Sequence, residues 1–303
     1  MSGAAWVAVK TKADGPLGKA DLADQDTKHN INTLAAALVY ARTGDERYRV
    51  KAIEALRDIK GTESGARSLA LGRNVAAYVI AADLIGDPEV DSWLKPWLRD
   101  IVRRKNAEGR SLIMCHEDRP NNWGTMCGAS RIAVALYTDD NEDLKRAAEV
   151  LQGYVGDRDT FAGFEFQDGS FSFICDDDEP RPINPEDCVE SGKSLSGAVV
   201  DDLQRAGSFS LPLKHTNYAW GGLSGAVAQA EMLDRAGYDA YEWEERGILR
   251  ATEFLEGIPG WERSSATRWV SWVVNGEYGT DFSAQEPTSN GRLLAFTDWT
   301  HAG

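Results

Sequence analysis

The segment NYAWGGLSGAVAQAEMLDRA, residues 217–236, decides the fold of this chain. Its small and apolar residues lie on all sides of a helix, which is typical of a helix enclosed by other helices. A glycine inside a helix costs up to about 1 kcal/mol relative to alanine. Gly221, Gly222 and Gly225 therefore predict close helix packing that offsets this cost.

Helical hairpins with the same design recur along the chain. A helix of mainly small and apolar residues is expected at 34–41, 69–85, 122–137 and 217–236, and a turn should end each one. The expected turns are Thr43-Gly44-Asp45, Ile85-Gly86-Asp87, Thr138-Asp139-Asp140 and Ala236-Gly237-Tyr238-Asp239. Glycine and aspartate stop one helix and start the next. The turns are 42, about 53 and about 98 residues apart, and the last spacing is close to two units, so the period falls in the range of stacked helical hairpins.

The helix after each of the first three turns differs from the helix before it, because its apolar residues form a single stripe. These stripes include Tyr48 to Ile59, Val90 to Ile101 and Leu144 to Val155. The two types of helix therefore predict an inner layer and an outer layer of helices. We predict an all-α fold, an (α/α) toroid or incomplete barrel of antiparallel helical hairpins. An α-solenoid has the same hairpins and differs only in curvature.

The 303 residues contain no long Pro/Gly/Ser-rich linker, so a single domain over 1–303 is expected. The helical pattern fails between about 157 and 192. There the stretch 161–174 predicts short strand-like pieces around an Asp168-Gly169 turn, within a loop insertion. Residues 176–179 are acidic but lack the spacing of a calcium-binding loop, which favours a solvated acidic loop.

Composition excludes several functions. A net charge of −15 argues against broad binding to nucleic acid or to anionic membranes. The longest apolar runs fall short of the roughly 20 residues that cross a bilayer. The N-terminal residues lack a basic segment followed by a long apolar stretch, so no signal peptide is visible in them.

The four cysteines have neither CxxC spacing nor paired histidines nearby, so a zinc site is not expected. Three disulfide connectivities are possible. Cys175 and Cys188 would close an irregular loop and are the first pair to test. Cys127 lies in an expected helix, where a cysteine often serves as a small buried apolar residue.

Two polar clusters stand at the starts of expected inner helices: Arg119-Pro120-Asn121-Asn122-Trp123-Gly124 and Leu213-Lys214-His215-Thr216-Asn217-Tyr218. Asn and Thr at such positions are ordinary N-caps, and the alternative is that these side chains face a cavity. Together the clusters supply Asn122, His215 and Tyr218, of which the last two can transfer protons. Arg73 and Asn74 begin another inner helix, and Trp220 offers a ring on which a sugar could stack.

These motifs resemble those of the alginate-lyase-like polysaccharide lyases, which have an (α/α) toroid fold. That family has an Asn-Asn-His element opening one inner helix and a Gly-Ser-Phe-x-Leu segment running into His-x-Asn-Tyr. This chain has Asn121-Asn122-Trp123, then Gly207-Ser208-Phe209-Ser210-Leu211 and His215-Thr216-Asn217-Tyr218. The resemblance spans roughly residues 30 to 280. Trp123 stands in place of the family's catalytic-site His, and Leu211 in place of its Arg.

The resemblance implies β-elimination from a uronic acid unit, with Asn122, His215 and Tyr218 as catalytic residues. Asn122 would stabilise the charge on the substrate carboxylate, and Tyr218 would act as base, acid or both. His215 would neutralise charge or serve as the base. Arg119, Lys214, Arg73, Asn74 and Trp220 would bind substrate. No metal or organic cofactor is required, and the partner would be an acidic polysaccharide.

Two other functions stay open. A glycoside hydrolase would use two carboxylates, with Glu165 and Asp168, or Asp201 and Asp202, as candidates. A non-catalytic glycan-binding or virion-associated module would suit the loss of the family's His and Arg. Localisation is undecided, and the substrate class favours an extracellular or particle-associated protein.

Overall fold

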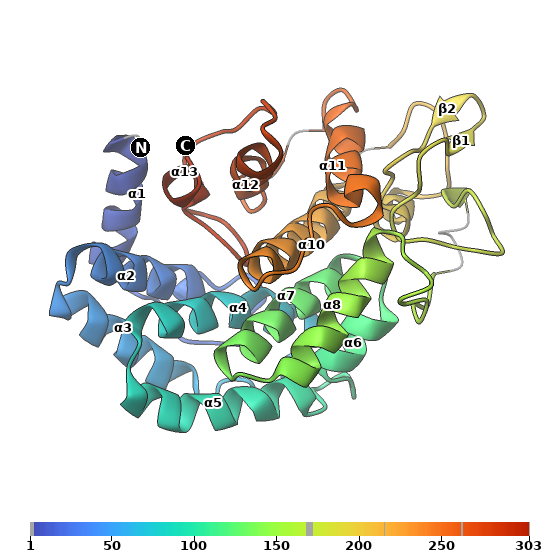
Figure 1. Ribbon diagram of the computed structural model, residues 1–303. Coiled ribbons are helices and arrows are strands. Elements are labelled where there is room, and N and C mark those ends of the chain that lie inside the picture. The colour runs from blue at the N-terminus through green and yellow to red at the C-terminus, as the bar shows by residue number, and fades with distance from the viewer. Residues whose placement is uncertain (1–2, 168–171, 215, 262, 303) are drawn as a thin grey trace.

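The computed structural model describes residues 3–167, 172–214, 216–261 and 263–302. Over these residues the regular structure is helical apart from one short β-hairpin, and the helices form an incomplete ring of antiparallel hairpins (Figure 1). This confirms the all-α, toroid-like class expected from the repeated turns. His215 and Asp168, two of the candidate residues, lie outside the described residues.

The inner layer consists of α2 (His29–Thr43), α4 (Ser68–Ile85), α7 (Asn122–Tyr137) and α10 (Asn217–Arg235). Each packs against the next, α2 on α4, α4 on α7 and α7 on α10. Glycine permits close approaches between them; a Cβ at Gly72 of α4, for example, would stand 2.9 Å from the Cys127 nitrogen in α7. The small residues in these helices therefore have the packing role that the sequence predicted.

The outer layer consists of α3 (Glu46–Ile59), α5 (Pro88–Arg103), α8 (Asn141–Val155) and α11 (Trp243–Glu256), with the short α6 (Leu112–Asp118) beside α7. Figure 1 shows α3 and α5 along the lower edge of the ring. The turns between the layers act as predicted. Gly44 and Gly86 have left-handed backbone conformations, and Asp45, Asp87 and Asp140 cap the helices that follow.

The terminal helices complete the structure. They are α1 (Gly3–Asp14), α12 (Trp269–Tyr278) and α13 (Thr297–Thr300). The rings of Trp6 in α1 and Trp299 in α13 lie 5.2 Å apart, so the two ends of the chain meet. α4 is long and apolar enough to cross a membrane, but 83% of it is buried inside the protein, as in the core helix of a globular fold.

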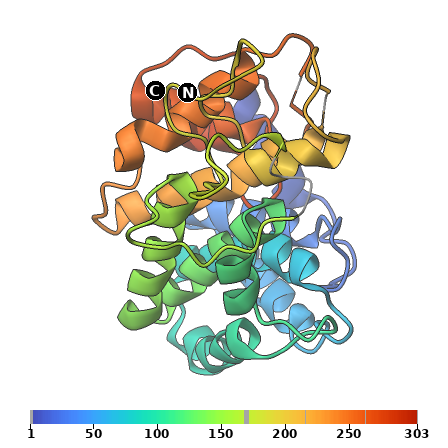
Figure 2. The same cartoon turned by 90° about the vertical axis from the view of Figure 1, so that its right-hand side faces the viewer.

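The loop insertion differs in part from the prediction. Residues 161–167 and 172–174 form no strand. The small hairpin is instead β1 (Val189–Glu190) paired with β2 (Lys193–Ser194). Figure 2 shows this part of the chain as loops in front of the helices. Phe161 and Phe173 are buried, so their side chains contribute to the core without pairing in a sheet. Cys175 and Cys188, the first pair to test among the three possible connectivities, form a disulfide.

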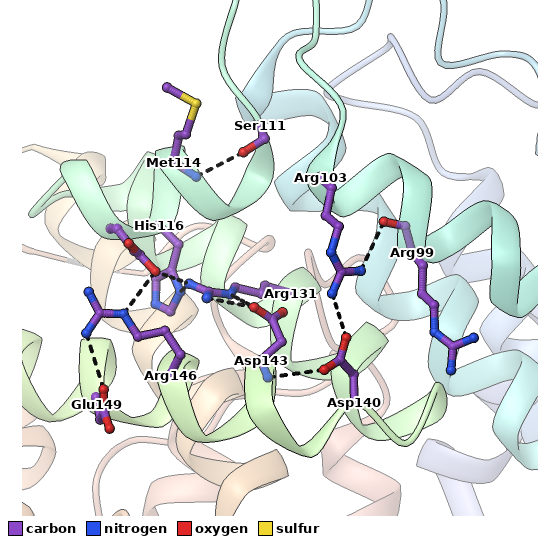
Figure 3. A network of polar contacts seen from close by, with 11 residues as sticks. Arg99, Arg103, Ser111, Met114, His116, Arg131, Asp140, Asp143, Arg146 and Glu149 are labelled. Atoms are coloured by element: carbon purple, nitrogen blue, oxygen red, sulfur yellow. Dashed lines mark hydrogen bonds and ion pairs between the residues drawn. The ribbon is translucent and has the colours of Figure 1, made fainter.

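A buried polar network fixes α7 between α6 and α8 (Figure 3). Arg131 of α7 is almost fully buried and pairs with Glu117 at 3.0 Å and Asp143 at 2.8 Å. His116 lies against the same guanidinium, and burial together with Arg131 lowers the pKa of His116 well below its usual value. The network determines how α7, and therefore its N-terminus, is oriented.

Candidate functional site

A cavity of about 500 Å³ opens at the N-terminal halves of the inner helices. Arg73 of α4, Asn122 of α7 and Tyr218 of α10 line it together, although they are far apart in sequence. Further lining residues come from η2 (Gln204–Ala206), from the segment between α11 and α12, and from the segment between α12 and α13. The lining residues are Arg73, Asn122, Met126, Arg205, Ala206, Thr216, Asn217, Tyr218, Gly221, Ser264, Thr267 and Arg292.

Asn122 is placed by the start of α7. Its neighbour Asn121 is the N-cap, and the Asn121 Oδ1 accepts a hydrogen bond from the Trp123 N–H at 3.0 Å. Asn122 does not cap the helix. Its side chain faces α10, where a Cβ at Gly221 would stand 3.5 Å from the Asn122 Cβ. The Asn122 Oδ1 is buried and has no hydrogen-bond partner among the described residues. The cluster therefore combines the two alternatives considered from the sequence: Asn121 caps the helix, and Asn122 faces the cavity.

Tyr218 is placed in the same way by the start of α10. Thr216 is the N-cap, and its Oγ1 accepts from the Tyr218 N–H at 3.1 Å. The Tyr218 side chain is 43% exposed, unusually open for an aromatic residue at an inner helix. The guanidinium of Arg205 lies over its ring, 4.4 Å from the centroid. A ligand in the cavity can thus reach the phenol from solvent.

Three arginines make the cavity electropositive. Arg73 and Arg292 share the exposed carboxylate of Asp26, at 3.6 and 2.7 Å. Burial first, and Arg292 second, lower the pKa of Arg73 to about 10, against the opposing effect of Asp26. Together with Arg205 these residues place three guanidiniums around the cavity, and none of the described residues that line it carries a carboxylate. This local charge opposes the net charge of −15 of the whole chain.

Four of the predicted binding residues lie away from the cavity lining. Trp220 is buried, and its indole N–H donates to the Trp261 carbonyl at 3.3 Å, so its ring is not open to a sugar. Asn74 is also buried and donates to the Asp24 carbonyl at 2.9 Å. Arg119 lies over the ring of Trp123, 4.5 Å from its centroid, and Lys214 is exposed near Gly207.

The departures from the family motifs have visible consequences. The guanidiniums of Arg67 and Arg119 both lie over the ring of Trp123, which does not line the cavity. Leu211 is 54% exposed and also lies outside the lining. Arg205, six residues before Leu211, brings a positive charge to the ring of Tyr218. The motif comparison missed it, and also missed Arg292, because neither lies at a motif position.

Asp168 lies outside the described residues, and the other three carboxylates considered for a hydrolase do not line this cavity. Asp201 and Asp202 are fully buried, and Glu165 lies on the surface near Arg110 at 3.8 Å. Among the described residues no group of three or more His, Cys, Asp or Glu side chains is arranged to hold a metal ion.

The fold is an all-α ring, and arginines line the cavity at the N-terminal ends of its inner helices. These features define a helical toroid protein that is suited to an acidic ligand. The family model for alginate lyase matches residues 10–162, half of the chain, and the protein belongs to that family. The matched region includes Asn122 and ends before Arg205 and Tyr218. No curated protein and no solved structure matches the chain.

Proposed function

We propose that this protein is a polysaccharide lyase that cleaves a uronic-acid-containing glycan by β-elimination. One observation carries the proposal: Asn122 and Tyr218 line a single cavity with three arginines, and no carboxylate is among the lining residues that the structure describes. The family membership supports the same reaction class.

Binding of the acidic sugar follows from the charges. The substrate carboxylate would accept hydrogen bonds from the Asn122 amide and from Arg73 or Arg292. Guanidinium groups bind carboxylates through paired, charge-assisted hydrogen bonds. The same contacts would strengthen as charge moves onto the carboxylate during the reaction, which is the condition for catalysis by charge stabilisation.

Tyr218 would then move the proton. As a phenolate it would take the hydrogen from C5, the C4–O bond would break, and a C4=C5 double bond would form. The neutral phenol could return a proton to the leaving C4 oxygen. The Arg205 guanidinium lies over the Tyr218 ring and places a positive charge beside the group that would move the proton. His215 remains a second candidate for the base or for charge neutralisation.

The first experiment is incubation with a panel of acidic polysaccharides that includes alginate. An increase in ultraviolet absorbance from the conjugated C4=C5 double bond would identify the lyase. New reducing ends without that absorbance would identify a hydrolase. Binding without turnover would identify a glycan-binding module.

Variants then test the roles. Tyr218→Phe removes only the hydroxyl and should lower kcat about 10²- to 10⁴-fold while KM changes little. Asn122→Ala should lower kcat by roughly 10² or more. Tyr238→Phe is a matched control, because Tyr238 packs on Trp243 outside the cavity. Activity of Tyr218→Phe close to that of Tyr238→Phe would refute the assignment of Tyr218 and leave His215 as the base.

A further inference from the structure

A short acidic segment connects the two sides of the cavity. Helix α9 (Val200–Leu203) continues directly into η2 (Gln204–Ala206). Asp201 and Asp202 of α9 reach the start of α7, and Arg205 of η2 reaches Tyr218 at the start of α10. The short segment 201–205 therefore links the start of α7, which carries Asn122, to the start of α10, which carries Tyr218.

Asp201 holds the N-cap of α7. Its Oδ2 accepts a hydrogen bond from the Asn121 Nδ2 at 2.6 Å, and both side chains are buried. The Oδ1 accepts from the Gln167 N–H at 3.3 Å. The amide of Asn121 is thus engaged at both ends, because its own Oδ1 caps the helix. This fixes the side chain that starts the helix immediately before Asn122.

Asp202 lies on the other side of the same helix start. Its side chain is fully buried, and the backbone N–H of Asn122 lies beside it without normal hydrogen-bond geometry. A Cβ at Gly222 of α10 would overlap the Asp202 Oδ2 and stand 3.3 Å from the Tyr154 hydroxyl of α8. The carboxyl group of Asp202 is therefore packed tightly at the point where α7, α8 and α10 meet.

We propose that Asp201 and Asp202 are positioning residues that hold Asn122 at a fixed place relative to Tyr218. The inference rests on the proposed function for its catalytic consequence. Its structural part, the anchoring of the start of α7, stands independently of activity. The two aspartates considered from sequence as hydrolase carboxylates thus acquire a different role, because they point into the protein and away from the cavity.

The test replaces Asp201 and follows the α7 amides by hydrogen exchange. Asp201→Leu removes the acceptor of the Asn121 amide, whereas Asp201→Asn keeps an acceptor oxygen. We expect Asp201→Leu to accelerate exchange of the Trp123 and Thr125 N–H groups at least 10-fold and to lower kcat at unchanged KM. Asp201→Asn should remain within about 3-fold of wild type in both measurements. The start of α8, capped by Asp140, is the internal control and should not change.

A second variant serves if Asp201→Leu does not fold. Asn121→Ser retains an N-cap oxygen but is too short to reach Asp201. It should reproduce the faster exchange at the start of α7. Unchanged exchange in a folded Asp201→Leu or Asn121→Ser variant would overturn the proposal. If wild type has no lyase activity on any glycan, the proposed function fails while the exchange experiment still decides the anchoring.

A second pair of groups carries an independent inference. Cys115 of α6 and Cys127 of α7 are both fully buried, and their sulfur atoms lie 2.6 Å apart. Two sulfur atoms that are not bonded do not approach this closely. We infer that Cys115 and Cys127 form a second disulfide, which ties α6 to α7 one and a half turns after Asn122. The two thiols would lose two protons and two electrons to a disulfide oxidant, which is reduced to two thiols.

The test is refolding of the reduced chain with reduced and oxidised glutathione, followed by alkylation in denaturant and mass analysis. Formation of the Cys175–Cys188 bond shows that oxidation took place, and refolding is repeated with more oxidised glutathione until it is complete. Absence of alkylation at Cys115 and Cys127, with their peptides linked, is the expected result. Two alkylated cysteines in chains that hold the Cys175–Cys188 bond would overturn the inference.

Discussion

The contact between α7 and α10 carries both Asn122 and Tyr218, so a substitution at that contact is the sharpest test of the fold. Gly225 of α10 faces α7, and a Cβ there would stand 2.6 Å from both the carbonyl carbon and the Cβ of Thr125. Much of this obstacle is backbone, which cannot rotate away as a flexible side chain could. Gly225→Ala therefore requires the two helices to separate by roughly 1 Å in a close-packed interior.

The expected loss of stability can be bounded. Overpacking of this kind costs about 1 to 3 kcal/mol, and alanine returns up to about 1 kcal/mol because it is the better helix former. A net loss of about 1 to 2 kcal/mol follows. Gly276 of α12 is the matched control, because it also lies within a helix and the nearest atom to its added Cβ is 3.8 Å away. Gly276→Ala should stabilise the protein by about 0.5 to 1 kcal/mol.

The measurement is urea-induced unfolding followed by far-ultraviolet circular dichroism, with wild type and both variants at one pH. Equal slopes would show that the free energies of unfolding can be compared. A Gly225→Ala variant as stable as Gly276→Ala would refute the reasoning, since it would mean that α7 and α10 do not approach as closely as described.

Three further substitutions test the buried charges. Arg131→Met leaves Glu117 and Asp143 without their shared partner and should cost about 3 to 5 kcal/mol in urea unfolding, unlike an exposed ion pair; a loss under 1 kcal/mol would contradict this. Burial raises the pKa of Asp202, so the folded state holds that proton more tightly and stability should fall as pH rises above the usual carboxyl value. Asp202→Asn should remove this fall and be more stable than wild type at pH 8, with a difference that disappears toward pH 4; a less stable variant at pH 8 would contradict it. For Glu231, burial alone would raise the pKa, but bonds from His301 and Arg235 outweigh it and lower the pKa to about 2. Glu231→Gln should therefore cost about 1 to 2 kcal/mol at pH 7, and thermal unfolding at decreasing pH should show this difference vanishing between about pH 4.5 and 2.

Local sequence determined the order of the helical hairpins. Gly44 and Gly86 end helices because glycine adopts the left-handed conformation without a Cβ clash. Asp45 and Asp87 start the next helices because the carboxylate of each accepts a hydrogen bond from a backbone N–H group in the first turn of the helix that follows. These interactions span a few residues, so the pattern of turns and apolar positions was sufficient to predict the class of fold. The strand-like pieces expected in 161–167 and 172–174 were predicted incorrectly, because aromatic residues such as Phe161 and Phe164 pack against α8 instead of pairing in a sheet.

The composition of the cavity depended on tertiary structure. Asn122 and Tyr218 could be proposed from motifs, but Arg205 and Arg292 reach the cavity from segments with no periodic signal. Trp220 has the residue type of a sugar platform and is nevertheless buried, because the packing around α10 encloses its ring. Charge and exposure at a site are sums over groups that are distant in sequence. Local sequence determines which helix each residue starts or ends, and only the packing of the helices decides which side chains meet.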